Sequence, residues 1–325
     1  MIIKKICLIL LLTGMTFFAE ATHIVGGELY YKHLGGTQYE ITLIVYRDCY
    51  TGVPPFDDPA TVGVWNASNN FLFAIELPAI DSIPIPPTIN SPCFIPPTDV
   101  CYIRCNYIDT ITLGTSIGGY QLAYQRCCRN QSILNIINPL DVGATFYAFI
   151  PGTSTAISNS NPVFTELPPP FVCAGLDFIF DHSAIDPEGD SLVYEICTPF
   201  DGASINYPVL SDLPNTSPQS VINFPPPYTN VVYQPPFNLG NLLGGTPLSI
   251  DPQTGLLTAN PNTIGQFVIG VCVNEYRNGV FLSKTRRDYQ LNVRSCPSLV
   301  VAALQTPVIT CGSNTVQFQN NSFGA

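Results

Sequence analysis

Apolar and polar residues alternate with a period of two in several parts of the chain, which is typical of half-buried β-strands. The pattern is clearest in short segments rich in β-branched and aromatic residues, namely 39–46, 120–128, 145–150, 192–197 and 266–273. Only residues 132–137 have a helical pattern, and that segment is short. The alternation therefore predicts an all-β fold.

Turn residues separate the predicted strands. Asn278 and Gly279 lie between strand-like segments and form the signature of a two-residue hairpin, because both tolerate positive φ. Residues 251–255 (DPQTG) separate two further segments in the same way. Ile24 begins the first expected strand. Together these features predict consecutive disulfide-stapled β-sandwiches.

The N-terminus has the pattern of a signal peptide. Lys4 and Lys5 precede an apolar run, and Ala19 and Ala21 supply small residues at positions −3 and −1 of a cleavage site. The apolar run is shorter than the ~20 residues that span a bilayer. We therefore expect residues 1–21 to be removed, the mature chain to have no transmembrane segment, and the protein to be extracellular or on the cell surface.

The charge balance excludes some partners. The formal net charge is −11, and removal of a leader that contains Lys4 and Lys5 makes it more negative. An acidic chain is a poor partner for nucleic acid or an anionic membrane surface. The basic residues Arg277, Lys284, Arg286, Arg287 and Arg294 are expected on the exposed face of a hairpin.

Cysteines in an exported protein usually form disulfides. Apart from Cys7 in the leader, they fall into two even groups and a single Cys311. The first group is Cys49, Cys93, Cys101, Cys105, Cys127 and Cys128; the second is Cys173, Cys197, Cys272 and Cys296. Connectivity within each group stays open.

Two local expectations concern the first group of cysteines. Cys101 and Cys105 are close in sequence and are the first candidates for a pair. Cys127 and Cys128 are adjacent in a strand-like segment, so their side chains should leave opposite faces and find different partners. A zinc site formed by these residues has suitable ligands, but oxidation is favoured in an exported chain.

The cysteine groups also suggest a division into domains. We expect an N-terminal cysteine-rich β domain at 22–165, a β-sandwich at 166–296 and the start of a third module at 297–325. The proline-rich stretch 159–170 falls between the first two and suits an interdomain connector. Residues 224–237 could present a ligand, although a rigid surface excursion is favoured. Cys311 has no evident partner, so we expect the natural protein to continue beyond Ala325.

Several segments resemble known bacterial modules. Residues 180–194 (FDHSAIDPEGDSLVY) resemble the acidic loop and following strand of cadherin-like and immunoglobulin-like repeats. Residues 248–256, 265–267 and 287–293 are similar to the other strands of that module, and 316–322 resemble the opening of a PKD-type β-sandwich. With the mature start THIVGGE, this order resembles the N-terminal part of large surface proteins of gliding Bacteroidota. The resemblance implies export by type IX secretion machinery.

The acidic loop suggests a cation site. Carboxylates at alternate positions around Gly189 can turn several oxygens toward one hard cation. Similar loops in cadherin-like modules bind calcium, which implies Asp186, Glu188 and Asp190 as ligands, with Asp181 or Asp288 as further contributors. The alternative is a solvated acidic turn. Apart from calcium, no cofactor is expected.

Known catalytic patterns are missing from the sequence. Ile24-Val25-Gly26-Gly27 resembles the processed N-terminus of trypsin-like proteases, but the context of a catalytic serine is absent. Asp57 and Asp58 are expected in a solvent-exposed turn rather than as a catalytic carboxylate pair. Phosphate-binding, zinc-protease and dinucleotide motifs are also absent. The expectation is that the protein is not an enzyme.

The sequence thus favours a non-enzymatic surface or secreted protein with an adhesive or spacer role. Its partner would be an extracellular protein or glycan. The alternative is the ancillary binding region of a secreted hydrolase whose catalytic domain lies outside this chain.

Overall fold

The computed structural model describes residues 24–50, 55–87, 94–202, 225–297, 303 and 319–322. Regular structure in these residues is almost entirely β-strand, which confirms the all-β prediction. The expected leader, Cys93, Cys311 and most of the expected third module lie outside the described residues. No helix in the described part of the chain is long and apolar enough to cross a membrane.

The first half of the chain contributes β1 (Ile24–Gly35), β2 (Gln38–Asp48), β3 (Ala60–Asn66), β4 (Phe71–Leu77), β5 (Ala79–Ile85), β6 (Tyr102–Thr112), β7 (Tyr120–Arg126) and β8 (Ala144–Ile150). The second half contributes β9 (Val163–Phe164), β10 (Phe171–Cys173), β11 (Phe178–Asp181), β12 (Ala184–Ile185), β13 (Ser191–Cys197), β14 (Thr246–Ile250), β15 (Leu256–Asn260), β16 (Gly265–Arg277) and β17 (Val280–Arg294). A single short 3₁₀ turn, Pro139–Asp141, interrupts this pattern within the described residues.

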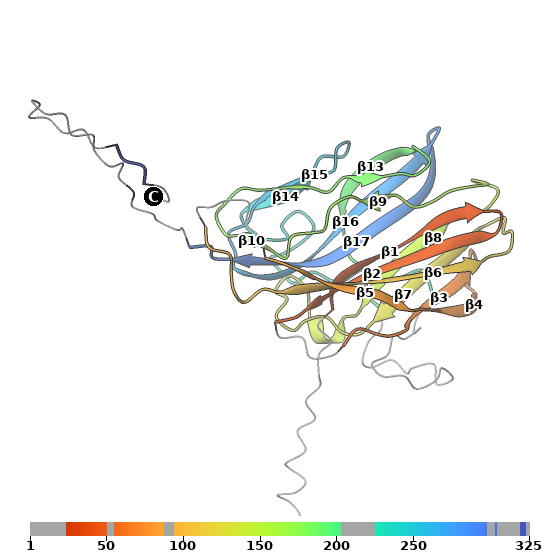
Figure 1. Ribbon diagram of the computed structural model, residues 1–325, viewed down its shortest axis with the longest axis horizontal. Helices are drawn as coiled ribbons and strands as arrows, with labels where there is room; N and C mark the ends of the chain where they lie inside the picture. The colour runs from red at the N-terminus through yellow and green to blue at the C-terminus, as the bar shows by residue number, and fades with distance from the viewer. Residues whose placement is uncertain are drawn as a thin grey trace, which may run out of the picture.

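An eight-stranded sheet runs through the molecule in the order β13-β16-β17-β1-β2-β6-β5, and β10 adds to it by pairing with β17. A four-stranded sheet, β4-β3-β7-β8, and a three-stranded sheet, β11-β15-β14, lie against it. Figure 1 shows the four-stranded sheet and the β14–β15 hairpin on opposite sides of the large sheet.

The hydrophobic cores lie on opposite faces of the large sheet. Where β1 pairs with β17, Gly27 lies opposite Asp288 and Gly26 opposite Tyr289. Residues directly opposite in a sheet share a face. Gly27 shares its face with Leu29 of the first core, whereas Gly26 shares the other face with Tyr289 of the second core. The large sheet is therefore the common layer of two sandwiches.

The two hydrophobic cores divide the chain near the boundary expected between the first two domains, whereas the large sheet continues across that boundary. The first core uses residues between 24 and 150, and the second uses residues between 164 and 293. The β1–β17 pairing joins them in one sheet. Part of the expected connector is packed into the protein, because Asn159 and Asn161 within it are buried. The division into separate domains stays a prediction.

Both predicted hairpins are present. Asn278 and Gly279 connect β16 with β17, and residues 251–255 connect β14 with β15. The helical interpretation of residues 132–137 is wrong. Ile133 and Ile136 are buried and form isolated bridges to Gln266 and Tyr233, so this segment packs as irregular chain against β16.

The described part of the proline-aromatic stretch packs against the four-stranded sheet. The ring of Tyr228 lies 6.4 Å from that of Trp65 and 5.8 Å from that of Tyr147, measured between centroids. Val231 is also buried. These side chains hold the stretch against the sheets, while most of the other residues between 225 and 236 are exposed, so its described part is a surface segment fixed by packing.

Disulfides join Cys49 to Cys101, Cys173 to Cys296 and Cys197 to Cys272. The expected pairing of Cys101 with Cys105 is wrong. Asp48 lies opposite Tyr102, which brings the preceding Cys101 beside Cys49 at the strand ends. Cys105 is four residues along the same strand, about 13 Å away in extended chain, and its free thiol is buried in the first core.

Cys127 and Cys128 form a disulfide with each other, so the expectation of different partners is also wrong. That expectation required a strand at this position, but β7 ends at Arg126 and the alternation of faces ends with it. The zinc interpretation fails as well, because Cys101, Cys127 and Cys128 are disulfide-bonded.

Candidate cation site

The acidic loop before β13 is a tight turn organised by Asp186. Asp186 Oδ1 accepts hydrogen bonds from the backbone N–H of Glu188 at 3.0 Å and of Asp190 at 2.8 Å. Gly189 supplies the positive φ of 81° that closes the turn. Asp186 Oδ2 is buried and has no hydrogen-bond partner.

Glu275 projects toward this loop from β16. It follows Val271 and Val273 on the face of β16 that packs into the second core, so its side chain is fully buried. Its Oε2 accepts hydrogen bonds from Asn159 Nδ2, at 3.0 Å, and from Ser283 Oγ. Its Oε1 has no hydrogen-bond partner.

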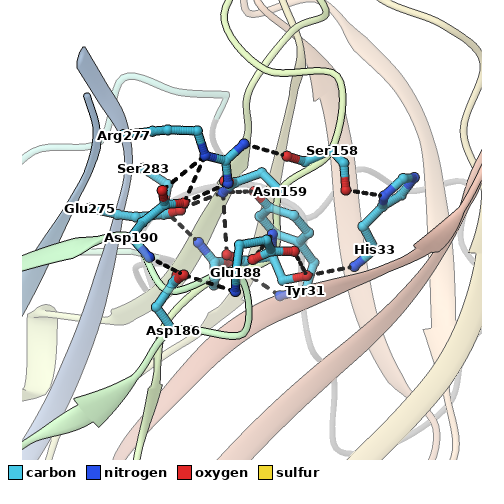
Figure 2. Close-up of polar contacts among 12 residues, drawn as sticks. Tyr31, His33, Ser158, Asn159, Asp186, Glu188, Asp190, Glu275, Arg277 and Ser283 are labelled. Carbon is cyan, nitrogen blue, oxygen red and sulfur yellow. Dashed lines mark hydrogen bonds and ion pairs between the residues drawn. The ribbon is translucent and has the colours of Figure 1, made fainter. Parts of the chain in front are cut away.

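These elements bring three carboxylates together (Figure 2). Oxygen atoms of Asp186, Asp190 and Glu275 all lie within 4.8 Å of one another. Carboxylate oxygens at this spacing are the ligands that a hard cation such as calcium prefers. The buried Oε1 of Glu275 has no hydrogen-bond partner in this arrangement, and either a cation or a proton shared with Asp190 would satisfy it.

Charge in the site is only partly balanced. Arg277 binds both carboxylate oxygens of Asp190, and these hydrogen bonds hold the pKa of Asp190 below its usual value. Burial, aided by the charge of Asp186, raises the pKa of Glu275 to about 8. A proton on Glu275 and a bound cation would each offset the remaining negative charge, so the two compete for the same place.

Hydrogen bonds tie the site to the first half of the chain. Arg277 donates to the carbonyl of Ser158 at 2.8 Å and to Asn159 Oδ1 at 3.0 Å. Asn159 in turn donates to the hydroxyl of Tyr31, and Ser158 contacts the ring of His33. Tyr31 and His33 belong to β1, so the site links β16, the acidic loop and β1 (Figure 2).

The expected ligands take different places. Asp186 and Asp190 belong to the group, whereas Glu188 accepts hydrogen bonds from the N–H and hydroxyl of Ser160. Asp181 accepts from the N–H of Ser183 in its own turn.

Asp288 lies on the opposite face of β17 from the cation group. The side chain of Asp288 is buried there and forms an ion pair with Arg129. It is therefore not available to a cation beside Glu275.

Glu275 was missed by the sequence analysis. Its only local signal is a carboxylate on the inward side of an alternating strand, directly after Val271 and Val273. Such a position disfavours a charged side chain unless a partner compensates it.

Two expectations about charged surface residues are wrong. Asp57 is not in a solvated turn, because its carboxylate is buried and paired with Arg126 at 2.8 Å. Arg287 is not on an exposed hairpin face either. It is buried against Glu28, with Nη2 and Oε1 2.9 Å apart. Both arginines offset buried carboxylates, a role that is decided by packing between distant segments.

Comparison of the chain with protein-family models, curated proteins and solved structures finds no match.

Proposed function

We propose that the chain is a non-enzymatic, exported protein with an adhesive or structural role, and that calcium stiffens the junction between its sandwiches. The observation that carries the proposal is that the carboxylates of Asp186, Asp190 and Glu275 lie close together. They meet where the acidic loop and β16 contact residues 158–159, the segment that is hydrogen-bonded to β1. All three ligands belong to the second half, so a cation there would act on the junction through the hydrogen bonds from Arg277 to Asn159 and from Asn159 to Tyr31. The disulfides and the resemblance to Bacteroidota surface proteins support an extracellular setting.

Thermal unfolding with calcium or with chelator tests this role. At pH 8.5 Glu275 is largely ionised, and saturating calcium should raise Tm by about 5–10 °C relative to EDTA. At pH 6 the shift should be smaller, because the proton on Glu275 competes with the cation.

Matched glutamine variants identify the ligands. Glu275→Gln should abolish the calcium-dependent shift, whereas Glu188→Gln should keep it, because Glu188 is directed to Ser160. A wild-type Tm that is the same in calcium and EDTA at pH 8.5 would contradict the cation site. Loss of the shift in Glu188→Gln alone would favour the ligand set expected from the sequence.

A further inference from the structure

A pocket of about 370 Å³ opens on the face of the large sheet that points away from the first core. Its floor is formed by alternate residues of β1, β2 and β6, and Val163 and Pro187 bound it. Its polar and aromatic floor residues are Tyr30, Lys32, Glu40, Thr42, Arg104 and Asn106. The volume lies at the lower end of the range of small-ligand sites.

The floor combines cations, hydrogen-bonding groups and an aromatic ring. Lys32 lies directly opposite Glu40, and Tyr30 lies opposite Thr42. Arg104 forms no ion pair with any carboxylate among the described residues, and its buried Nε has no hydrogen-bond partner.

Asn106 also has an unused polar atom. Its Nδ2 donates to Asp81 at 2.7 Å, but its buried Oδ1 accepts nothing. A buried polar atom without a partner is unfavourable, so a ligand whose binding brought partners to Arg104 and Asn106 would gain affinity.

The sheet itself restricts the kind of ligand. β2 is paired with β1 and β6 along the floor, whereas β1 pairs with β17 only at Gly26 and Gly27. Beside the floor, the edge of β1 is occupied by residues 160–161 instead: Tyr31 exchanges hydrogen bonds with Asn161, and the N–H of His33 donates to Ser160 Oγ. An extended peptide therefore cannot add a strand to β1 there. Recognition must use side chains.

We propose that this pocket binds a uronic-acid unit of an acidic polysaccharide. The guanidinium of Arg104 can hold the sugar carboxylate through paired charge-assisted hydrogen bonds, and Lys32 adds a second positive charge. Glu40 can accept hydrogen bonds from sugar hydroxyls, and the ring of Tyr30 offers an apolar surface to the sugar ring. The inference names a ligand for the adhesive role proposed above, but it rests on the pocket and not on the cation site.

Calorimetric titration of the whole protein at low ionic strength tests the pocket. The probes are trisaccharides of glucuronic, galacturonic and mannuronic acid, with the corresponding neutral hexose trisaccharides and a tetraglutamate peptide as comparisons. We expect saturable binding of at least one uronate trisaccharide, and binding of its neutral counterpart at least tenfold weaker, because the Arg104 contact is lost.

Variants locate the binding. Arg104→Gln should weaken uronate binding about tenfold or more, whereas Lys284→Gln, on β17 and paired with Glu195, should leave it unchanged. If Arg104→Gln fails to fold, the exposed Lys32→Gln serves instead, with an expected loss of about threefold.

The proposal is overturned if no uronate trisaccharide binds saturably, if the pocket variants bind as tightly as the wild type, or if tetraglutamate binds equally well. Each of these results would leave the calcium response of the junction unaffected, so failure of the pocket is distinguishable from failure of the proposed function.

Discussion

At the scale of single residues, Glu275 makes the stability of the protein depend on pH. Its pKa is raised from 4.5 to about 8 in the folded chain, mainly by burial. Between these values the folded state keeps a proton that the unfolded state releases. In EDTA, its contribution to stability is therefore fully present below about pH 4.5 and is lost as pH rises to about 8, by up to ~1.4 kcal/mol per pH unit.

Urea unfolding in EDTA from pH 5 to 9 measures this contribution. Glu275→Gln cannot titrate, so its free energy of unfolding should fall less steeply with pH than that of the wild type. Glu76→Gln, at an exposed position of β4, is the control and should follow the wild type. Identical slopes for wild type and Glu275→Gln would show that Glu275 does not hold a proton in this range.

The residues of the site differ in how far the sequence predicts them. The acidic loop is local, so the spacing of Asp186, Gly189 and Asp190 already indicated a turn with converging oxygens. Glu275 comes from a strand far along the chain, and only the pairing of β16 with β13 brings it to the loop. The diversion of Glu188 to Ser160 likewise depends on a contact that no local pattern contains.

At the scale of elements, the junction of β1 with β17 depends on a close approach that only glycine permits. A Cβ added to Gly26 would lie 2.3 Å from the carbonyl oxygen of Asp288, which is backbone and cannot move aside. Gly26→Ala should therefore lower the free energy of unfolding by about 1–3 kcal/mol. Equilibrium urea unfolding gives the value.

Gly114→Ala is the matched control for the junction. A Cβ there would lie 3.7 Å from the hydroxyl of Tyr120, an ordinary contact, so its stability should stay close to that of the wild type. Equal stability of Gly26→Ala and the wild type would mean that the two strands can separate without cost.

Elements joined by short turns were predictable, and distant pairings were not. The β16–β17 hairpin was evident from Asn278 and Gly279, because turn chemistry and strand alternation agree within a few residues. Nothing in the local pattern indicated that β1 would pair with β17. The error at Cys127 arose similarly, because alternation suggested a longer strand than the structure has.

At the scale of the whole molecule, buried ion pairs fasten the two halves together. Glu28 of β1 binds Arg287, and Arg129 binds Asp288 at a distance of 2.5 Å. Separation of the halves would break both pairs, and any of these charges that stayed buried would be left without its partner, which is unfavourable. The shared sheet and these contacts favour unfolding as one unit, despite the two hydrophobic cores.

A disulfide variant tests this cooperativity at a distance. The double variant Cys173→Ser/Cys296→Ser removes a disulfide of the second half that joins residues 123 positions apart. Its loss should lower the free energy of unfolding by about 2–5 kcal/mol. Trp65, the single tryptophan, lies in β3 of the first half and reports there by fluorescence. If the halves unfold together, its urea midpoint falls with the variant and coincides with far-UV circular dichroism. An unchanged Trp65 midpoint beside a shifted circular dichroism signal would instead establish two independently folding domains.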